Sequence, residues 1–271
     1  MAGNVRGSVH VTHFAALMLG LAFVGTAQPA LSATCPRPDT LGTSRTLVVD
    51  ARQHPLIGSM QYRETLPLDD GEVVLTFDDG PWPATTSKVL QALADECVRA
   101  TFFLIGKSAS DHPELVRKMA AGGHTIGHHS WSHRNLKYAK PEIADAEIDK
   151  GIAAVEAALH GQPTTTPTTP FFRFPYFEMT PRTLDNLEKR GIAVFGADFW
   201  ASDWNRMTPQ HELKLLTERL EIARKGIILL HDPKAQTAAM LPAFLRYLRD
   251  HRYRVVHIVP PAPKTVADRA R

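Results

Sequence analysis

The chain has 271 residues, of which 44% are hydrophobic and 22% are charged, and its formal net charge at neutral pH is +3. This composition is typical of an ordinary globular protein with one sizeable core. Acidic and basic residues are mixed along the sequence, with no dense block of Lys and Arg between aromatic residues. Nucleic acid is therefore not expected as a partner.

The N-terminal segment has the pattern of an export signal. Arg6 precedes an apolar run from Phe14 to Val24, and small residues follow up to Ala33. This pattern predicts a signal peptide over residues 1–33 with cleavage after Ala33. The apolar run is too short to span a bilayer comfortably. A retained membrane anchor is the alternative. We expect an exported protein, periplasmic or secreted, with no stable membrane insertion after cleavage.

The sequence contains only two cysteines, Cys35 and Cys97. Export would place both in an oxidising compartment, where a disulfide can persist. The distance between their Cα atoms cannot be read from the sequence, so a disulfide and two unpaired thiols both stay open.

Three further regions follow the predicted signal peptide. Residues 34–70 are rich in Pro, Thr and Arg and show little periodicity apart from a β-like stretch at 46–49, which predicts an extension draped on the main domain. From Gly71 to about residue 260, strand and helix patterns alternate, so the main domain is predicted at 71–260. Residues 261–271 are a tail.

Seven strands are predicted in the main domain: one ends at Phe77, and the others span 100–106, 124–127, 171–174, 192–197, 227–230 and 253–259. Helical patterns lie between them. This alternation predicts a parallel α/β sheet, either open and doubly wound or closed into a barrel. Candidate site residues fall at or just past the carboxyl ends of nearly every strand, an arrangement that favours a barrel of seven strands.

Two motifs suggest metal chemistry. Asp78 and Asp79 end a buried strand, and such a pair is costly unless a cation or an Arg, such as Arg173, neutralises it. His129 and His133 have the spacing that aligns two imidazoles on a helical turn. Two His with one carboxylate suit Zn²⁺ and hydrolysis, although Fe(II) oxygenases use the same set. A solvated turn and structural histidines are the alternatives.

Five ordered segments carry a family resemblance: TFDDG (76–80), HSWSH (129–133), RFPY (173–176), DFWASDW (198–204) and LLHD (229–232). Over about residues 71–260 they resemble the motifs of NodB-type polysaccharide deacetylases, carbohydrate esterase family 4. The resemblance implies a distorted (β/α)7 barrel and a divalent metal, usually zinc, with other divalent transition metals possible. It also implies N-deacetylation of N-acetylated glycans such as chitin oligomers or peptidoglycan, with release of acetate.

The resemblance implies a role for each matching residue. Asp79, His129 and His133 would bind the metal. Asp78 would be the general base that takes a proton from the attacking water, and His231 the general acid that protonates the leaving amine.

Supporting roles are implied in the same way. Arg173 would keep Asp78 ionised, and Asp203 would orient His231 and keep it charged. The backbone N–H of Tyr176 would help to bind the oxyanion. Trp204 and Leu229 would wall the pocket for the acetyl methyl group, unless they only pack in the core.

Several alternatives stay open. His128 instead of its neighbour could ligate the metal, and Asp198 instead of Asp203 could support His231. The enzyme could hydrolyse O-acetyl groups or non-sugar amides on the same fold. The protein could also be a glycan-binding module without catalysis. The sequence gives no indication of the oligomeric state.

Overall fold

The computed structural model describes residues 1, 3, 35 and 39–262. The predicted signal peptide, its cleavage site and most of the predicted tail lie outside the described residues. The chain divides into two units, Met1–Thr34 and Cys35–Arg271, and the fold described below is that of the second. Among the described helices, none has the length and apolar character needed to cross a membrane.

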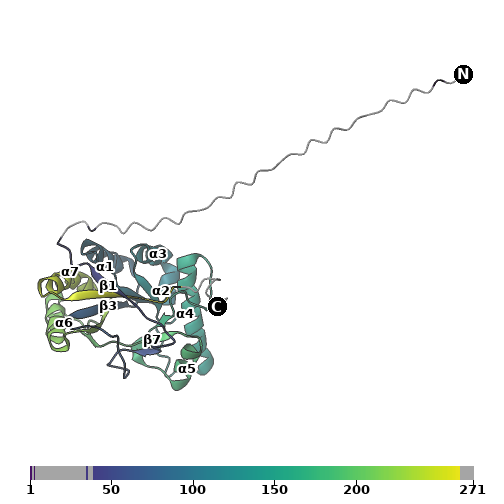
Figure 1. The fold of residues 1–271 in the computed structure, drawn as a ribbon. Helices are drawn as coiled ribbons and strands as arrows, with labels where there is room; N and C mark the ends of the chain where they lie inside the picture. The colour runs from purple at the N-terminus through teal and green to yellow at the C-terminus, as the bar shows by residue number, and fades with distance from the viewer. Residues whose placement is uncertain (2, 4–34, 36–38, 263–271) are drawn as a thin grey trace. The chain divides into compact units, whose positions relative to one another are not determined.

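Strands and helices alternate along the chain, with the helices arranged around the strands (Figure 1). The strands are β1 (Thr43–Val48), β2 (Leu56–Ile57), β3 (Glu72–Asp78), β4 (Thr101–Leu104), β5 (Thr125–His128), β6 (Phe171–Phe172), β7 (Ala193–Phe195), β8 (Phe199–Trp200), β9 (Gly226–His231) and β10 (Arg254–Val259). The helices are α1 (Pro83–Asp95), α2 (Gly106–Asp111), α3 (Pro113–Ala121), α4 (Pro141–His160), α5 (Pro181–Lys189), α6 (Pro209–Ala223) and α7 (Ala235–Asp250), with a short 3₁₀ turn, η1 (Pro175–Phe177).

All strand pairs of the described sheet are parallel, as the alternating pattern predicted. Strands β3 to β7 pair in chain order, and β9 pairs with both β3 and β8. Every residue of β3 and β9 is buried, which explains their nearly continuous apolar sequences, because helices cover the outside of a parallel sheet.

The ring of strands is interrupted at one place. β7 and β8 run in the same direction, are separated by residues 196–198, and bond to different neighbours. They form one broken strand. At this point the covalent chain links β7 to β8, and no pairing between the described strands joins β7 to β8 or β9. The predicted barrel is therefore confirmed in a distorted form. The last predicted strand exists as β10, which bonds only to the first two residues of β3 and to β1.

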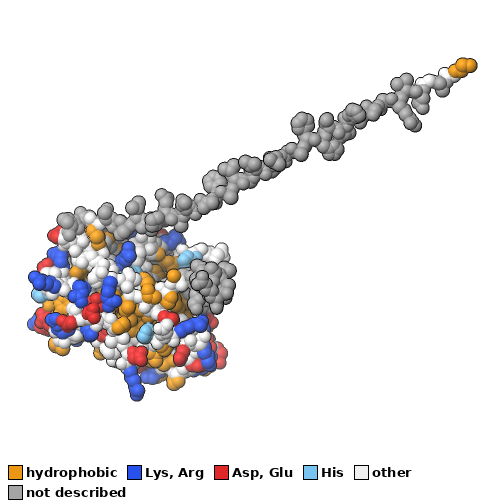
Figure 2. Space-filling model, in the orientation of Figure 1, with side chains coloured by type: hydrophobic (Ala, Val, Ile, Leu, Met, Phe, Trp, Pro, Cys, Tyr) orange, Lys and Arg blue, Asp and Glu red, His pale blue; other side chains and the backbone are white. Residues whose placement is uncertain are grey.

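The segment before residue 71 belongs to the sheet. β1 pairs with β10, and β2 pairs with β7 beside the break. The segment expected to be draped on the domain therefore supplies two strands to it. On the face shown in Figure 2, cationic and anionic side chains are interspersed, as the mixed sequence led us to expect.

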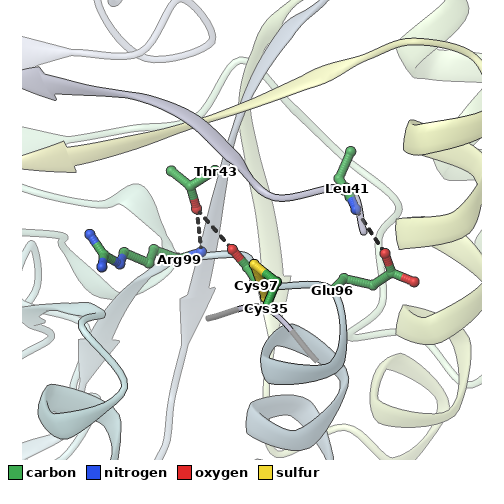
Figure 3. Close-up of a disulfide and its surroundings, with 6 residues drawn as sticks. All are labelled: Cys35, Leu41, Thr43, Glu96, Cys97 and Arg99. Atoms are coloured by element: carbon green, nitrogen blue, oxygen red, sulfur yellow. Dashed lines mark hydrogen bonds between the residues drawn. A yellow bond between two sulfur atoms is a disulfide. The ribbon is translucent and has the colours of Figure 1, made fainter. Parts of the chain in front are cut away.

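Cys35 and Cys97 form a disulfide with their Cα atoms 5.7 Å apart, which decides the pairing that the sequence left open. The bond joins the start of the described N-terminal segment to the end of α1 (Figure 3). Beside it, the Arg99 backbone N–H donates to Thr43 Oγ1 at 2.8 Å, and the Leu41 N–H donates to Glu96 Oε2 at 2.9 Å. The disulfide therefore fastens β1 where hydrogen bonds already hold it.

Removal of this disulfide should destabilise the protein. Because the bond links residues 62 positions apart, the paired replacement Cys35→Ser/Cys97→Ser should lower the free energy of unfolding by about 2–4 kcal/mol. Urea unfolding of both proteins, with and without a reducing agent, measures this. A reductant should lower the stability of the wild-type protein and leave that of the variant unchanged. Equal stability of the two proteins without reductant would contradict the prediction.

A buried histidine should make the fold sensitive to acid. His257 Nε2 lies 2.9 Å from Thr125 Oγ1, and burial, aided by the charge of Arg99, lowers the pKa of His257 to about 4. In the unfolded chain that pKa is about 6.5, so between pH 6.5 and 4 only the unfolded state binds the proton. Stability is then fully present above this window and falls as the pH drops through it.

We expect a loss of up to about 3 kcal/mol from this group across the window. Urea unfolding at pH 7.5 and pH 4.5 measures the loss. His257→Gln should show a smaller difference between the two pH values, and the control His211→Gln, an exposed histidine of α6, should behave as wild type. A wild-type difference in His257→Gln would show that another group carries the acid sensitivity.

Candidate active site

The predicted site residues gather at the carboxyl ends of the strands, because parallel strands end at the same edge. Asp78 is the last residue of β3 and pairs in register with His231, the last residue of β9. Asp79 follows β3 with φ 74°, and His129 follows β5. One edge of the sheet therefore presents two carboxylates and two imidazoles.

Asp79, His129 and His133 form the group that could bind a metal ion, and their ligand atoms all lie within 4.8 Å of one another. Asp79 Oδ1 is 3.4 Å from His129 Nε2 and 3.2 Å from His133 Nε2. Asp79 Oδ1 is buried and has no hydrogen-bond partner among the described residues. This unsatisfied oxygen and the two-His, one-Asp donor set fit a divalent cation.

The expected helical turn between the two histidines is absent. Residues 129–133 form an irregular loop in which Ser130 and His133 have positive φ values of 60° and 58°. The two imidazole rings still meet, with centroids 4.9 Å apart. The backbone conformation of the loop, and not helical periodicity, brings them together.

The electrostatics prepare this group for a cation. Burial alone would raise the pKa of Asp79, but the His129 imidazole 3.4 Å away and the charges of His231 and His133 outweigh burial and lower that pKa. Burial lowers the pKa of His133 to about 4, aided by His129 and opposed by Asp79 and Asp78. His129 Nδ1–H donates to the Arg173 carbonyl at 2.7 Å, so its Nε2 lone pair is free to ligate.

Asp78 is held by a buried arginine. Arg173 Nη1 donates to Asp78 Oδ1 at 2.7 Å and to Thr76 Oγ1 at 2.9 Å, and Nη2 donates to the Gly196 carbonyl at 2.7 Å. Burial lowers the pKa of Arg173, and the carboxylate of Asp78 opposes that shift. Asp78 Oδ2 lies on the other side, 3.9 Å from His129 Nε2. One carboxylate oxygen is thus anchored while the other faces the metal-binding group.

His231 is held by Asp203. The Nδ1–H of His231 donates to Asp203 Oδ1 at 2.7 Å, and its backbone N–H donates to Oδ2 at 2.8 Å. Burial alone would lower the pKa of His231, but the hydrogen bond and charge of Asp203, with the charges of Asp79 and Asp78, raise it to about 9. His231 is therefore a proton donor at neutral pH.

Asp198 and His128, the two residues considered as alternatives, have other partners in the structure. The Asp198 carboxylate accepts hydrogen bonds from Ser59, Thr65 and the Ile227 N–H. The carboxylate that bonds to the His231 ring is that of Asp203. His128 is fully buried with Nε2 3.8 Å from Glu156 Oε1, and it is not part of the metal-binding group of the described residues.

The residues expected to contact substrate differ in exposure. Tyr176, with φ 59°, is 62% exposed, and its ring packs edge-on against His133 with centroids 4.6 Å apart. Trp204 is 46% exposed, with its ring centroid 6.0 Å from that of His231. Leu229 is buried in β9. Two aromatic rings therefore flank the site, one beside a candidate ligand and one beside the proton donor.

The sequence analysis assigned no role to one carboxyl group beside the site, that of Asp232. Asp232 is fully buried, accepts a hydrogen bond from Thr86 Oγ1, and lies against Gly80, where any Cβ would collide with its carboxylate. Burial raises the pKa of Asp232 to about 7. Its place directly after His231 was the available signal.

Comparison with known proteins identifies a family. Residues 66–195 match the family model of polysaccharide deacetylases. The chain is 35% identical over 161 residues to a chitooligosaccharide deacetylase of Bradyrhizobium sp., covering 59% of this chain and 70% of that protein. It is 31% identical over 188 residues to the peptidoglycan-N-acetylglucosamine deacetylase PgdA of Listeria monocytogenes, covering 69% of this chain and 38% of that protein.

The fold also resembles a solved structure. The peptidoglycan deacetylase Bd3279 of Bdellovibrio bacteriovorus superposes with a TM-score of 0.73 at 30% identity, covering 84% of this chain and 62% of that one. The parallel α/β fold and the similarity to named deacetylases define the protein as a hydrolase. This chain belongs to the polysaccharide deacetylase family.

Replacement of Asp203 should change the protonation of His231. In Asp203→Asn the negative charge is lost, so the pKa of His231 should fall from about 9 toward or below the ordinary value of about 6.5. NMR titration of the His231 ring measures it, with Asp185→Asn, an exposed α5 residue that pairs with Lys189, as the control. An unchanged pKa would mean that Asp203 does not set the charge of His231.

Proposed function

We propose that the protein is an exported, zinc-dependent hydrolase that removes N-acetyl groups from glycans containing N-acetylglucosamine, of the peptidoglycan or chitin type, and releases acetate. The observation that carries the proposal is the grouping at one sheet edge of a candidate metal set, an anchored carboxylate and a protonated imidazole. The related proteins named above are deacetylases of chitooligosaccharides and of peptidoglycan, and both substrates carry N-acetylglucosamine.

Asp79, His129 and His133 would hold the Zn²⁺. Two imidazoles and one carboxylate are a common ligand set of catalytic zinc sites, although they also suit other divalent transition metals. Bound there, the ion would supply Lewis-acid polarisation of the amide carbonyl and activation of water.

Asp78 acts as the general base. Arg173 occupies one of its oxygens, and the second oxygen lies toward the candidate metal group. Asp78 accepts a proton from the attacking water while the water oxygen bonds to the amide carbon. The Tyr176 backbone N–H stabilises the developing oxyanion.

His231 acts as the general acid. An amine leaves poorly as an anion, so the C–N bond breaks as His231 transfers its proton to the nitrogen. The raised pKa of about 9 keeps that proton on the ring at neutral pH. Trp204 beside His231 and Leu229 of the same strand border the acetyl methyl group. The products are acetate and the free amino sugar.

Export is supported by two features. Residues 1–33 have the pattern of a signal peptide, and the disulfide between Cys35 and Cys97 is of the kind that persists outside the cytosol. The protein would act in the periplasm or outside the cell, where peptidoglycan and chitin-like glycans are accessible.

Acetate release from chito-oligosaccharides and from peptidoglycan tests the proposal. A chelator should abolish release and Zn²⁺ should restore it. Asp78→Asn should lower kcat by about 10²–10⁴-fold, because the base is lost while the zinc ligands remain. Asp185→Asn, on exposed α5, should retain wild-type activity.

Three results would overturn the proposal. Wild-type activity in Asp78→Asn would remove the base, and binding of glycans without turnover would indicate a glycan-binding module. Release of acetate only from O-acetylated or non-sugar substrates would assign the same fold to a different hydrolase.

A further inference from the structure

The two histidines of the candidate metal group are held in different ways. His129 is 3% exposed, and its Nδ1 is fixed by the Arg173 carbonyl. The His133 side chain is 24% exposed, and among the described residues the polar partner of its ring is Asp79 Oδ1. The position of the His133 ring therefore depends on the backbone of residues 130–133.

That backbone has an uncommon conformation. Ser130 and His133 both have positive φ values, which non-glycine residues adopt rarely and keep only where surrounding contacts fix them. Within the loop, the His133 N–H donates to Ser130 Oγ at 3.1 Å. From α2, the Gly106 and Lys107 N–H groups donate to the carbonyls of Ser130 and Trp131, each at 2.9 Å. These bonds fix the first half of the loop.

Helix α4 fixes the other side of the loop. Glu147 Oε2 accepts the Ser132 N–H at 2.9 Å, and Glu147 Oε1 accepts the Ser132 hydroxyl at 2.7 Å. One turn further along, Lys150 Nζ lies 3.8 Å from the centre of the Trp131 ring. Three consecutive loop residues are thus held between two helices.

Gly151 allows this close approach. A Cβ at Gly151 would lie 2.8 Å from the Trp131 nitrogen and closer still to the Ser130 carbonyl group, which are backbone atoms that cannot rotate away. The same glycine faces Gly106 of α2, where an added Cβ would lie 2.7 Å from the Gly151 Cα. Any side chain at Gly151 must push α4 and the loop apart.

We propose that α4 is the element that positions the metal ligand His133, with Glu147 and Gly151 as its positioning residues. Among the described residues, no hydrogen bond or ion pair joins either residue to the ligand group; each acts by keeping residues 130–132 in the conformation that brings His133 Nε2 to Asp79. The inference rests on the metal site of the proposed function, and it adds two residues outside the five family motifs. Loss of a residue that orients a ligand commonly weakens metal binding by 10–100-fold.

The test is the dissociation constant of Zn²⁺, measured by competition with a chromophoric chelator on apoprotein. Glu147→Ala should weaken binding about 10-fold. Glu147→Gln should recover part of the loss, because its amide oxygen can still accept one hydrogen bond. Gly151→Ala should weaken binding at least as much as Glu147→Ala. Glu142→Ala, an exposed glutamate in the first turn of the same helix, is the matched control and should bind as wild type.

A second measurement separates positioning from general stability. The melting temperature of apo Glu147→Ala should match that of apo Glu142→Ala, and excess Zn²⁺ should restore kcat in Glu147→Ala. Wild-type zinc affinity in Glu147→Ala would overturn the inference, as would a lower melting temperature with unchanged affinity. If Gly151→Ala does not fold, the two Glu147 variants still decide. Failure of the wild-type protein to bind zinc would instead contradict the proposed function.

Discussion

The buried ion pair between Arg173 and Asp78 is the interaction on which the site depends. Both side chains are almost inaccessible, so breaking the pair would leave an uncompensated charge in the interior. Arg173 also donates to Thr76 on β3 and to the carbonyls of Phe195 and Gly196 at the end of β7. The guanidinium group therefore connects opposite parts of the barrel while it orients the carboxylate.

The break in the ring of strands lies where Arg173 and the N-terminal segment bond to backbone groups of the chain. Around residues 196–198 the backbone bonds partly to neighbouring strands, since the Gly196 N–H donates to the Ile57 carbonyl of β2 and the Asp198 N–H to the Ile227 carbonyl of β9, and partly to other groups. The Gly196 carbonyl accepts from Arg173, and the Ala197 N–H donates to Gln61 Oε1. Asp198 takes up donors from the N-terminal segment, Ser59 and Thr65. That segment thus satisfies backbone groups that a regular barrel would pair, which makes it a required part of the fold.

Local sequence signals predicted the parts of the molecule that local physics decides. The apolar run of β3 and the Thr180 cap before Pro181 were readable, because burial on both faces and N-capping leave marks within a few residues. The loop at 129–133 was misjudged as a helical turn, since its conformation depends on distant contacts such as Glu147. The break before β8 was also unreadable, because it depends on Arg173 and the N-terminal segment.

Asp78 and His231 are held by partners of opposite charge. Asp78 and His231 are register neighbours at the ends of β3 and β9, and each is bonded to a different charged side chain. The partner of Asp78 is a guanidinium group and the partner of His231 is a carboxylate. A divalent cation bound by Asp79 would place positive charge near His231 and so favour its neutral form. The hydrogen bond and charge of Asp203 raise the pKa of His231 and would oppose this effect, so an imidazole without such a partner would lose its proton more readily.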